Sequence, residues 1–282
     1  MSYSNFDIYM KEFEKIDAGV TLHPGIPVCI RLDGRGFHNV TKKCERPFDP
    51  VLRKVMERVT EDVVNECGAA IGYTQSDEIS LVLSPGKSLS TMYFGGRVQK
   101  LCSILASVAS VSFNEYVEEF DLESVTSPGY FDCRCWNVPT MEFAADVIMW
   151  RQRDAIKNSI SMAARSKFSH VQLLNKNGME KILMLKDAGI DYYSYRAQDR
   201  QGIILRKTLV NRKFTPEEIE RLPPMHEARK NPDMIVSRQT ITAIPGPCLS
   251  HVINRKDYLF DGADPIMREE NSNQYIIDMI EK

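Results

Sequence analysis

Residues 28–40 read VCIRLDGRGFHNV: an apolar run, an aspartate, a Gly-Arg-Gly turn, and then an aromatic residue and a histidine. The run Val28–Leu32 is short, rich in branched residues and preceded by the sequence HPGIP, which predicts a buried strand. Asp33 stands where this strand ends, and Gly34 and Gly36 leave the next turn without bulk. The stretch therefore predicts a central strand with a carboxylate at its mouth.

The segments that follow predict a helix and a hairpin. Asp49 is a suitable N-cap, Pro50 suits the first helical position, and valines recur at every fourth residue until Gly68 ends the pattern. Further on, the polar turn QSDE (75–78) joins two apolar runs, as in a hairpin. The remaining elements expected here are strands over 69–74 and 79–83, a helix over about 91–118 and a strand over 130–138.

The order of these elements is strand, helix, strand, strand, helix, strand. This is the split βαβ arrangement of ferredoxin-like domains, an α+β fold in which two helices cover one face of an antiparallel sheet. The first strand and the hairpin strands are then neighbours near the centre of the sheet. Asp33 should therefore lie beside Asp77 and Glu78, although the two aspartates are far apart in the chain.

The rest of the chain predicts a mainly helical part and an extension. Helical patterns cover 141–168 and 177–189, and residues 201–210 read as a further strand. Prolines cluster late, in RLPPMHEARKNPD and AIPGPC, which suggests that a core ends near residue 230. We expect three parts: 1–140 with the sheet, 141–230 completing it, and an extension over 231–282.

Composition sets limits on the class of protein. Of the 282 residues, 36 are basic and 38 acidic, so no global positive field attracts nucleic acid and any such partner needs a local patch. No apolar run approaches the roughly 20 residues that cross a bilayer, and the N-terminal residues lack a signal-peptide layout. Seven irregularly spaced cysteines suit a reducing compartment. We expect a cytoplasmic protein without a membrane partner.

Two carboxylates that converge from separate strands suit a hard divalent cation. Mg²⁺ prefers oxygen ligands and keeps positions for water and phosphate. The Gly34 carbonyl would add a ligand, and the backbone N–H groups around Gly36 would receive an anion. The alternative is a plain turn, since Asp-Gly is common in hairpins. The chain contains neither a Walker A loop nor a Rossmann fingerprint.

Four motifs stand in the order typical of one known family. They are RLDGRGFH (Arg31–His38), QSDE (Gln75–Glu78), FDCR (Phe131–Arg134) and WRQRDA (Trp150–Ala155). Over about residues 5–215 the chain resembles the tRNA-His guanylyltransferase superfamily, which extends the 5′ end of tRNA in the 3′-to-5′ direction with a polymerase-type palm. The resemblance implies a palm-like catalytic domain over 1–140, two Mg²⁺ ions, ATP and GTP as substrates, tRNA as partner and a homotetramer.

The resemblance also implies roles for individual residues. Asp33 and Asp77 would ligate both metal ions with help from the Gly34 carbonyl, and Glu78 would complete the catalytic acids. No side-chain nucleophile is needed, because the 3′-hydroxyl of the incoming nucleotide attacks the activated 5′ phosphate. The expected nucleotide-binding residues are Asp33, Gly34, Arg35, Gly36, Phe37, His38, Arg46, Asp49, Ser76, Asp77, Arg97 and Lys100.

Basic residues on and after the helix at 141–168 predict contacts with the RNA backbone, chiefly by charge and shape. For each of them the alternative is an ordinary solvated helix face. The expected RNA-binding residues are Arg151, Arg153, Lys157, Asn158, Arg165, Lys167, Arg206 and Lys207.

One motif departs from the family pattern. Enzymes that act on tRNA-His carry His-Ile-Asn-Asn-Leu-Tyr-Asn after the WRQ sequence, whereas this chain reads IKNSISM, with Ile156 in place of the histidine. It looks more like the bacterial, archaeal and phage-type relatives that repair 5′-truncated tRNA by template-directed addition. We therefore favour a template-dependent 3′-5′ nucleotidyltransferase. The alternatives are a tRNA-His guanylyltransferase adding G at position −1, a palm-type nucleotide cyclase, and a nucleotide- or RNA-binding module without catalysis.

Overall fold

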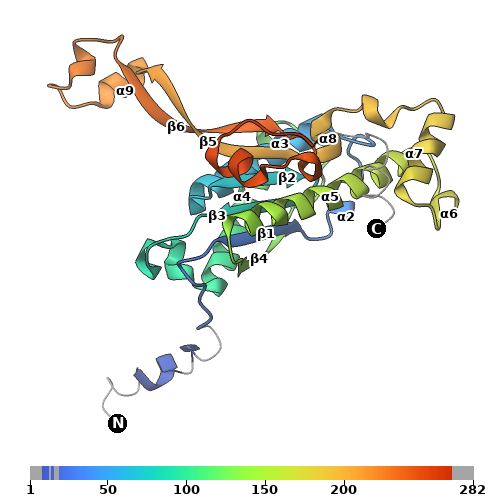
Figure 1. Ribbon diagram of the computed structural model, residues 1–282, viewed down its shortest axis with the longest axis horizontal. Helices are drawn as coiled ribbons and strands as arrows, with labels where there is room; N and C mark the ends of the chain where they lie inside the picture. Colours follow the sequence, from blue (N-terminus) through green and yellow to red (C-terminus); the bar gives the residue numbers. More distant parts are fainter. Residues whose placement is uncertain (1–7, 13, 16–18, 269–282) are drawn as a thin grey trace.

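The computed structural model describes residues 8–12, 14–15 and 19–268 of the chain (Figure 1). Its centre is an antiparallel six-stranded sheet in the order β4-β1-β3-β2-β5-β6. The first strand and the hairpin are neighbours within it, as the sequence predicts. The strands are β1 (Val28–Gly34), β2 (Ile71–Gln75), β3 (Glu78–Leu83), β4 (Phe131–Asn137), β5 (Ile203–Lys213) and β6 (Ile235–Pro245).

Two helices cover one face of the sheet, α3 (Pro50–Cys67) and α4 (Val98–Glu119). Asp49 caps α3 as expected, because its Oδ1 accepts hydrogen bonds from the backbone N–H groups of Val51 and Leu52 at 2.9 and 3.0 Å. The long helix α4 starts later than predicted. Gly95 and Gly96 have positive φ and leave two short 3-10 turns, Leu89–Thr91 and Tyr93–Gly96, in place of its first turns.

The opposite face is covered by α5 (Met141–Arg165), so the sheet lies between two helical layers (Figure 1). The ferredoxin-like arrangement of α3 and α4 is confirmed, and α5 adds a layer to it. The need for this second layer follows from β2, all of whose residues are buried. Ile71 and Tyr73 pack on the α5 side, and a strand that is buried on both faces needs cover on both. Beyond α5 lie α6 (His170–Leu173), α7 (Gly178–Asp187) and α8 (Ala197–Gln201).

The part expected as an extension begins inside the sheet. β6 pairs with the whole of β5, and the outer end of this two-stranded ribbon projects beyond the sheet, with α9 (Pro216–Arg221) at its tip (Figure 1). Leu249, Val252 and Leu259 are fully buried in the core against α5. The boundary expected near residue 230 is therefore wrong for the described residues, because 235–259 complete both the sheet and its second core.

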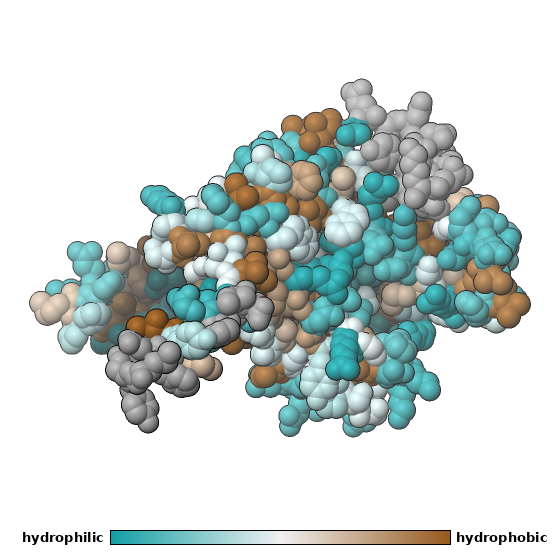
Figure 2. Space-filling model, turned by 90° about the horizontal axis from the view of Figure 1, so that it is seen from below, coloured by the Kyte–Doolittle hydropathy of each residue, from teal (hydrophilic) through white to brown (hydrophobic). Residues whose placement is uncertain are grey.

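Short elements connect these layers. They are α2 (Phe37–Val40), the 3-10 helices Tyr192–Ser194, Glu227–Arg229 and Leu249–His251, and the π-helical turn Asp257–Asp261. No helix in the described ranges is long and apolar enough to span a bilayer. Figure 2 shows a surface of mixed polarity, with apolar side chains exposed at the end where α6 and α7 lie, among them Val171, Leu174 and Leu183.

Candidate active site

The three predicted acids meet at one end of the central strands. Asp33 on β1 is in register with Glu78 on β3 and with Asp132 on β4, so these three side chains share the face covered by α5. Asp77 lies in the β2–β3 turn, and its carbonyl accepts the backbone N–H of Gly34 at 3.0 Å. The prediction that Asp33 lies beside Asp77 and Glu78 is confirmed.

These acids line a cleft of about 280 Å³ between the β2–β3 turn and α5. The turn side supplies acidic and hydroxyl groups, whereas the helix side supplies Asn158, Ser161 and Arg165. A cleft with carboxylates on one wall and a cation on the other accommodates a metal ion together with phosphate groups. The residues on its rim are Asp33, Tyr73, Gln75, Ser76, Asp77, Glu78, Arg151, Ala155, Asn158, Ser161, Met162 and Arg165.

The β2–β3 turn is held by a strained residue and by hydrogen bonds. Ser76 has φ 57°, a left-handed conformation that non-glycine residues seldom adopt. Its hydroxyl donates to Asp77 Oδ1 at 3.0 Å, and the Thr74 hydroxyl donates to the Glu78 carbonyl at 3.0 Å. The Gln75 side chain donates to the Asp199 carbonyl at 3.3 Å. The turn is therefore fixed from both sides, and Asp77 points into the cleft from a defined backbone.

Asp33 and Asp77 form the part of the site that fits a cation. Burial raises the pKa of Asp77, the hydrogen bond from Ser76 opposes this, and the charges of Asp33 and Glu78 raise it further. Neither aspartate has a basic partner in the described part of the chain, so the negative charge of these two half-buried side chains lacks compensation there. Two carboxylates suit Mg²⁺, which completes its octahedron with water and phosphate oxygens. No group of three or more His, Cys, Asp or Glu among the described residues is arranged as a metal site.

Glu78 has a different environment from the two aspartates. Arg151 on α5 donates from Nε to Glu78 Oε1 at 2.6 Å and from Nη2 to Oε2 at 2.5 Å, and Nη2 also reaches Asp154 at 2.8 Å. The Arg151 side chain is only 8% exposed. The guanidinium of Arg151 is therefore engaged inside the protein, and the structure gives no support to the RNA contact predicted for it.

The Gly-Arg-Gly turn owes its glycines to two different causes. A Cβ on Gly34 would lie 2.4 Å from the ring of Phe37, which packs at 5.0 Å from both Phe113 and Phe131. Gly36 has φ 63° and precedes α2. Phe37 is 3% exposed, so its ring belongs to the core beneath the turn, and the nucleotide contact predicted for this residue would have to come from its backbone. Arg35 and His38 are exposed and remain candidates for phosphate or base.

The other predicted phosphate residues are not all near the cleft. Arg46 is exposed, and its Nη2 donates to the Thr41 carbonyl at 3.2 Å, close to the Gly-Arg-Gly turn. Arg97 and Lys100 lie at the opposite end of the sheet in this chain. Ser110 lies in the middle of α4, and its hydroxyl accepts the Phe131 N–H at the start of β4. The N-terminal end of α4 therefore lies near the other end of that strand. Within one chain, Arg97 and Lys100 are therefore outside the cleft.

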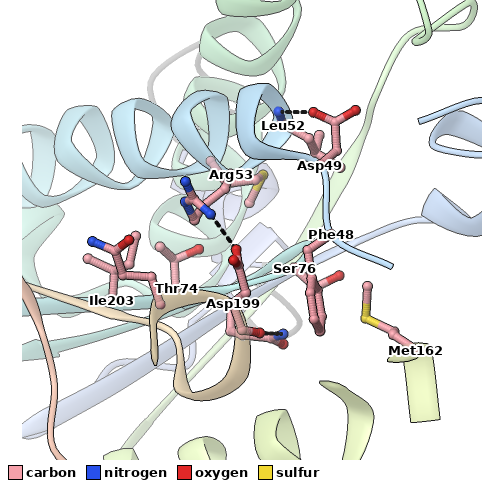
Figure 3. Close-up of a pocket in the computed structure, with 12 residues that line it drawn as sticks. Phe48, Asp49, Leu52, Arg53, Thr74, Ser76, Met162, Asp199 and Ile203 are labelled. Carbon is pink, nitrogen blue, oxygen red and sulfur yellow. Dashed lines mark hydrogen bonds and ion pairs between the residues drawn. The ribbon is translucent and has the colours of Figure 1, made fainter. Parts of the chain in front are cut away.

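A second, smaller cavity of about 60 Å³ lies behind Ser76 (Figure 3). Its lining is mostly apolar and includes Phe48, Met162 and Ile203, while the ion pair between Arg53 and Asp199 crosses one side. The Asp49 carboxylate points toward the N-terminal end of α3. Its Oδ2 also accepts the backbone N–H of Glu45 at 3.0 Å. Asp49 is thus committed to the helix cap, and a nucleotide contact would have to share that carboxylate.

Sequence reasoning did not single out Arg31, which lies close to the acids of the site but is not among the residues that line the cleft. It lies two residues before Asp33 on the same face of β1, opposite Arg134 of β4. Its Nε is buried and lacks a hydrogen-bond partner in the described chain, whereas Arg134 pairs with Asp132 at 3.1 Å. Like charges opposite each other are unfavourable unless an anion lies between them. The period-2 alternation of β1, which puts residues 31 and 33 on one face, was the available signal.

The predicted RNA-binding residues divide into exposed and engaged groups. Asn158 and Arg165 line the cleft, Lys157 and Lys167 are exposed on or just after α5, and Arg153 and Lys207 are half-buried. Arg206 is different, because its Nη1 donates to the Tyr258 carbonyl at 2.6 Å and its guanidinium lies over the Tyr258 ring. The prediction for Arg206 is therefore wrong for this structure: it ties β5 to the C-terminal segment.

An antiparallel palm with carboxylates at the mouth of β1 and in the following hairpin turn is the architecture of nucleotidyltransferases of the polymerase type. The sequence model of the family described as tRNAHis guanylyltransferase matches residues 7–139. A tRNA(His) guanylyltransferase of Schizosaccharomyces pombe is 32% identical over 163 residues, 57% of this chain and 59% of that protein. These matches place residues 7–139, the catalytic part of the chain, in the tRNA-His guanylyltransferase superfamily.

Solved structures agree with this placement over most of the chain. A bacterial tRNA(His) guanylyltransferase-like protein in complex with ATP superposes with a TM-score of 0.71 and 29% identity, covering 91% of this chain and 97% of that one. A second bacterial structure, in complex with GTP, gives a TM-score of 0.68 and 26% identity, with 91% and 98% coverage. The similarity therefore extends over most of the chain, well beyond the residues that the family model matches.

Proposed function

We propose that this protein is a template-dependent 3′-5′ nucleotidyltransferase that adds nucleotides to the 5′ end of truncated tRNA. The observation that carries the proposal is the pair Asp33 and Asp77, two carboxylates without a basic partner in the described chain, at the edge of a 280 Å³ cleft. Arg165 and Asn158 face them from α5. Such a cleft suits metal-assisted phosphoryl transfer on a polyanionic substrate.

The residues of the cleft have separable tasks in this reaction. Asp33, Asp77 and the Gly34 carbonyl would hold two Mg²⁺ ions, beside which the 3′-hydroxyl of an incoming nucleotide loses its proton more readily. Arg35, His38 and the backbone N–H groups of the Gly-Arg-Gly turn bind triphosphate oxygens. The oxygen of that hydroxyl would bond to the 5′ phosphorus of the activated tRNA, and the bond to the leaving group would break, which releases AMP from an adenylylated end or pyrophosphate from a triphosphate end. ATP and GTP are the proposed nucleotides, and the similarity to ATP- and GTP-bound proteins supports this.

Arg31 and Arg134 extend the phosphate site along the sheet. They lie on the face of Asp33, two residues farther from the turn, and Arg31 has no partner in the described chain. A phosphate of the RNA strand or of the triphosphate would neutralise both guanidinium groups. Arg153, Lys157, Lys167 and Lys207 would contact more distant parts of the tRNA backbone.

Repair of truncated tRNA is favoured over addition of G at position −1 because of residue 156. Ile156 occupies the place of the histidine expected for tRNA-His enzymes, and its side chain packs against the apolar cluster around Ile160 and Leu185. An apolar residue there leaves no imidazole for activation or recognition. The high coverage of bacterial guanylyltransferase-like structures supports the same choice. We also propose a homotetramer, because Arg97 and Lys100 lie outside the cleft of their own chain and would bind phosphate only at the site of a neighbouring chain.

The test is an extension assay with labelled RNA. The protein is incubated with Mg²⁺, nucleotides and a tRNA that lacks its first 5′ nucleotide, with each of the four opposing bases in turn. We expect addition of the complementary nucleotide, and loss of addition in D33N and D77N. Addition that ignores the opposing base, or that occurs only on full-length tRNA-His, would contradict the repair function. Product formed from nucleotide alone would identify a cyclase.

A further inference from the structure

Arg151 is the most completely engaged cation at the site. Three of its hydrogen bonds end on carboxylates, two on Glu78 and one on Asp154, and Ser80 adds a hydrogen bond to Glu78 Oε1 at 3.3 Å. The guanidinium also lies over the Trp150 ring, 4.5 Å from its centre. A bidentate, stacked arginine fixes both its own plane and that of its carboxylate partner.

The acid that Arg151 holds is the neighbour of a proposed metal ligand. Glu78 follows Asp77 directly and stands in register with Asp33, so three carboxylates converge within one turn and one strand pair. Each Glu78 oxygen accepts a hydrogen bond from Arg151 and Oε1 also accepts one from Ser80, so its charge is already neutralised and it is a weaker ligand for a cation than the two aspartates. Without Arg151, three carboxylates would repel one another and all three would compete for the same ion.

We propose that Arg151 is a positioning residue for the metal site, which keeps Glu78 out of the ligand set so that Asp33 and Asp77 alone hold the cations. A buried ion pair of this kind adds little net stability, because desolvation of the two charges offsets their attraction. The ion pair instead orients the side chains of the site. It holds Glu78 against α5, whereas Asp77, the preceding residue, lines the cleft.

This inference assigns the WRQRD segment of α5 to the metal site. Trp150 supports the guanidinium from one side, and Asp154 takes the Nη2 hydrogen that Glu78 leaves. Arg151 and Asp154 are spaced i, i+3 and so lie on the same side of the helix. Residues 150, 151 and 154 thus act as a unit through Glu78.

The experiment measures Mn²⁺ binding to the RNA-free protein by electron paramagnetic resonance, with D33N/D77N as the blank. R151Q frees Glu78 and removes one positive charge, so we expect Mn²⁺ to bind at least about fivefold more tightly while kcat for nucleotide addition falls. In R151Q/E78Q both members of the pair are neutral, and Mn²⁺ affinity should return to within about twofold of the wild-type value. The double variant leaves no unpaired charge in this partly buried site, and E78Q is isosteric with Glu78, which protects the fold.

A matched control is a second ion pair that involves α5. Arg255 binds Asp146 of α5 through Nε and Nη2 at 3.1 and 2.8 Å, far from the cleft in sequence and outside its lining. R255Q removes a comparable ion pair and should leave Mn²⁺ affinity unchanged. Weaker or unchanged Mn²⁺ binding in R151Q overturns the proposal, as does a loss of more than about tenfold in R151Q/E78Q, which would make Glu78 a ligand.

The inference rests on the metal site of the proposed function, yet the two fail separately. If the Mn²⁺ affinities follow the expected order but no RNA is extended, the positioning role of Arg151 stands and the proposed reaction is wrong. If RNA is extended but R151Q binds Mn²⁺ no more tightly than the wild type, the reaction stands and Arg151 has another task. A wild-type protein that binds no more Mn²⁺ than the D33N/D77N blank overturns the positioning role.

Discussion

Asp33 and Glu78 lie directly opposite each other on β1 and β3, yet only Glu78 is paired with a cation of the protein. Because only one of the two facing carboxylates has a basic partner, the two have different functions. Glu78 is neutralised inside the protein, whereas Asp33, together with Asp77 in the turn, keeps its charge for a ligand in the cleft. Stability and activity should therefore respond differently to the loss of each acid.

The first prediction concerns D77N. Burial raises the pKa of Asp77 above its unfolded value, so the stability associated with its protonated form is present at low pH and is lost as pH rises through the folded pKa. Without metal at neutral pH, D77N should therefore raise Tm by about 2–4 °C, the shift that about 1 kcal/mol gives in a protein of this size. Nucleotide addition should fall at least about 100-fold.

Thermal unfolding followed by circular dichroism, from pH 4 to pH 8 without and with Mg²⁺, checks the D77N prediction. The difference in Tm between D77N and the wild-type protein should disappear at the acid end of this range and also when Mg²⁺ is added. A D77N protein less stable than the wild type at neutral pH would contradict the assignment of an uncompensated charge.

The second prediction concerns Arg31. Because its guanidinium has no partner in the described chain, R31A breaks no internal ion pair and should change the free energy of unfolding by less than about 0.5 kcal/mol. The loss of a charge-assisted contact to phosphate should raise KM about tenfold, the effect of about 1.4 kcal/mol. Steady-state kinetics and urea unfolding measure both quantities; a destabilised R31A with unchanged KM would make Arg31 a structural residue.

The sequence predicted the part of the fold that local patterns control. β1, the hairpin and α3 follow from branched residues, turn residues and the Asp49 cap, and the order of elements then places Asp33 beside Asp77. The pairing of Arg151 with Glu78 could not be predicted, because it joins residues 73 positions apart across a helix–sheet contact. An arginine on a polar helix face looks the same in sequence whether it meets RNA or a buried carboxylate.

The same limit explains the other errors. Phe37 stands in the turn that is expected to bind nucleotide, but contacts of its ring with Phe113 and Phe131, far away in the chain, make the side chain part of the core. The proline-rich region near residue 230 suggests a domain boundary, yet it only forms the tip between β5 and β6. In each case local composition was read correctly and the long-range partner decided the role.

The third prediction compares two glycines of one turn. G34A should cost about 1–3 kcal/mol of unfolding free energy, because its Cβ would overlap the Phe37 ring, which two other rings prevent from moving. G36A meets no atom within 4 Å and should cost only about 1 kcal/mol, from its φ of 63°. Urea unfolding checks both. The explanation requires that G34A/F37L recover part of the loss, and it is wrong if G34A and G36A cost the same.

The last prediction concerns Gln152, which is 1% exposed and joins the C-terminal segment to α5. Its Oε1 accepts the Leu249 N–H at 2.6 Å, and its Nε2 donates to the carbonyls of Pro247 and Gln201 at 3.0 and 3.3 Å. Q152A leaves these buried groups without partners and should cost about 2–3 kcal/mol. Q239A, on the exposed part of β6, should change the unfolding free energy by less than about 0.5 kcal/mol.

Hydrogen exchange distinguishes local from global effects of Q152A. Because Gln152 contacts residues 201, 247 and 249, protection should fall first over 246–259, while amides of β1 and β3 should exchange only at the rate set by global unfolding. The segment would then be a separately opening cover on the second core, and nucleotide addition should persist at temperatures below the first transition. Equal loss of protection in β1 and in 246–259 would show that the segment and the palm unfold as one unit.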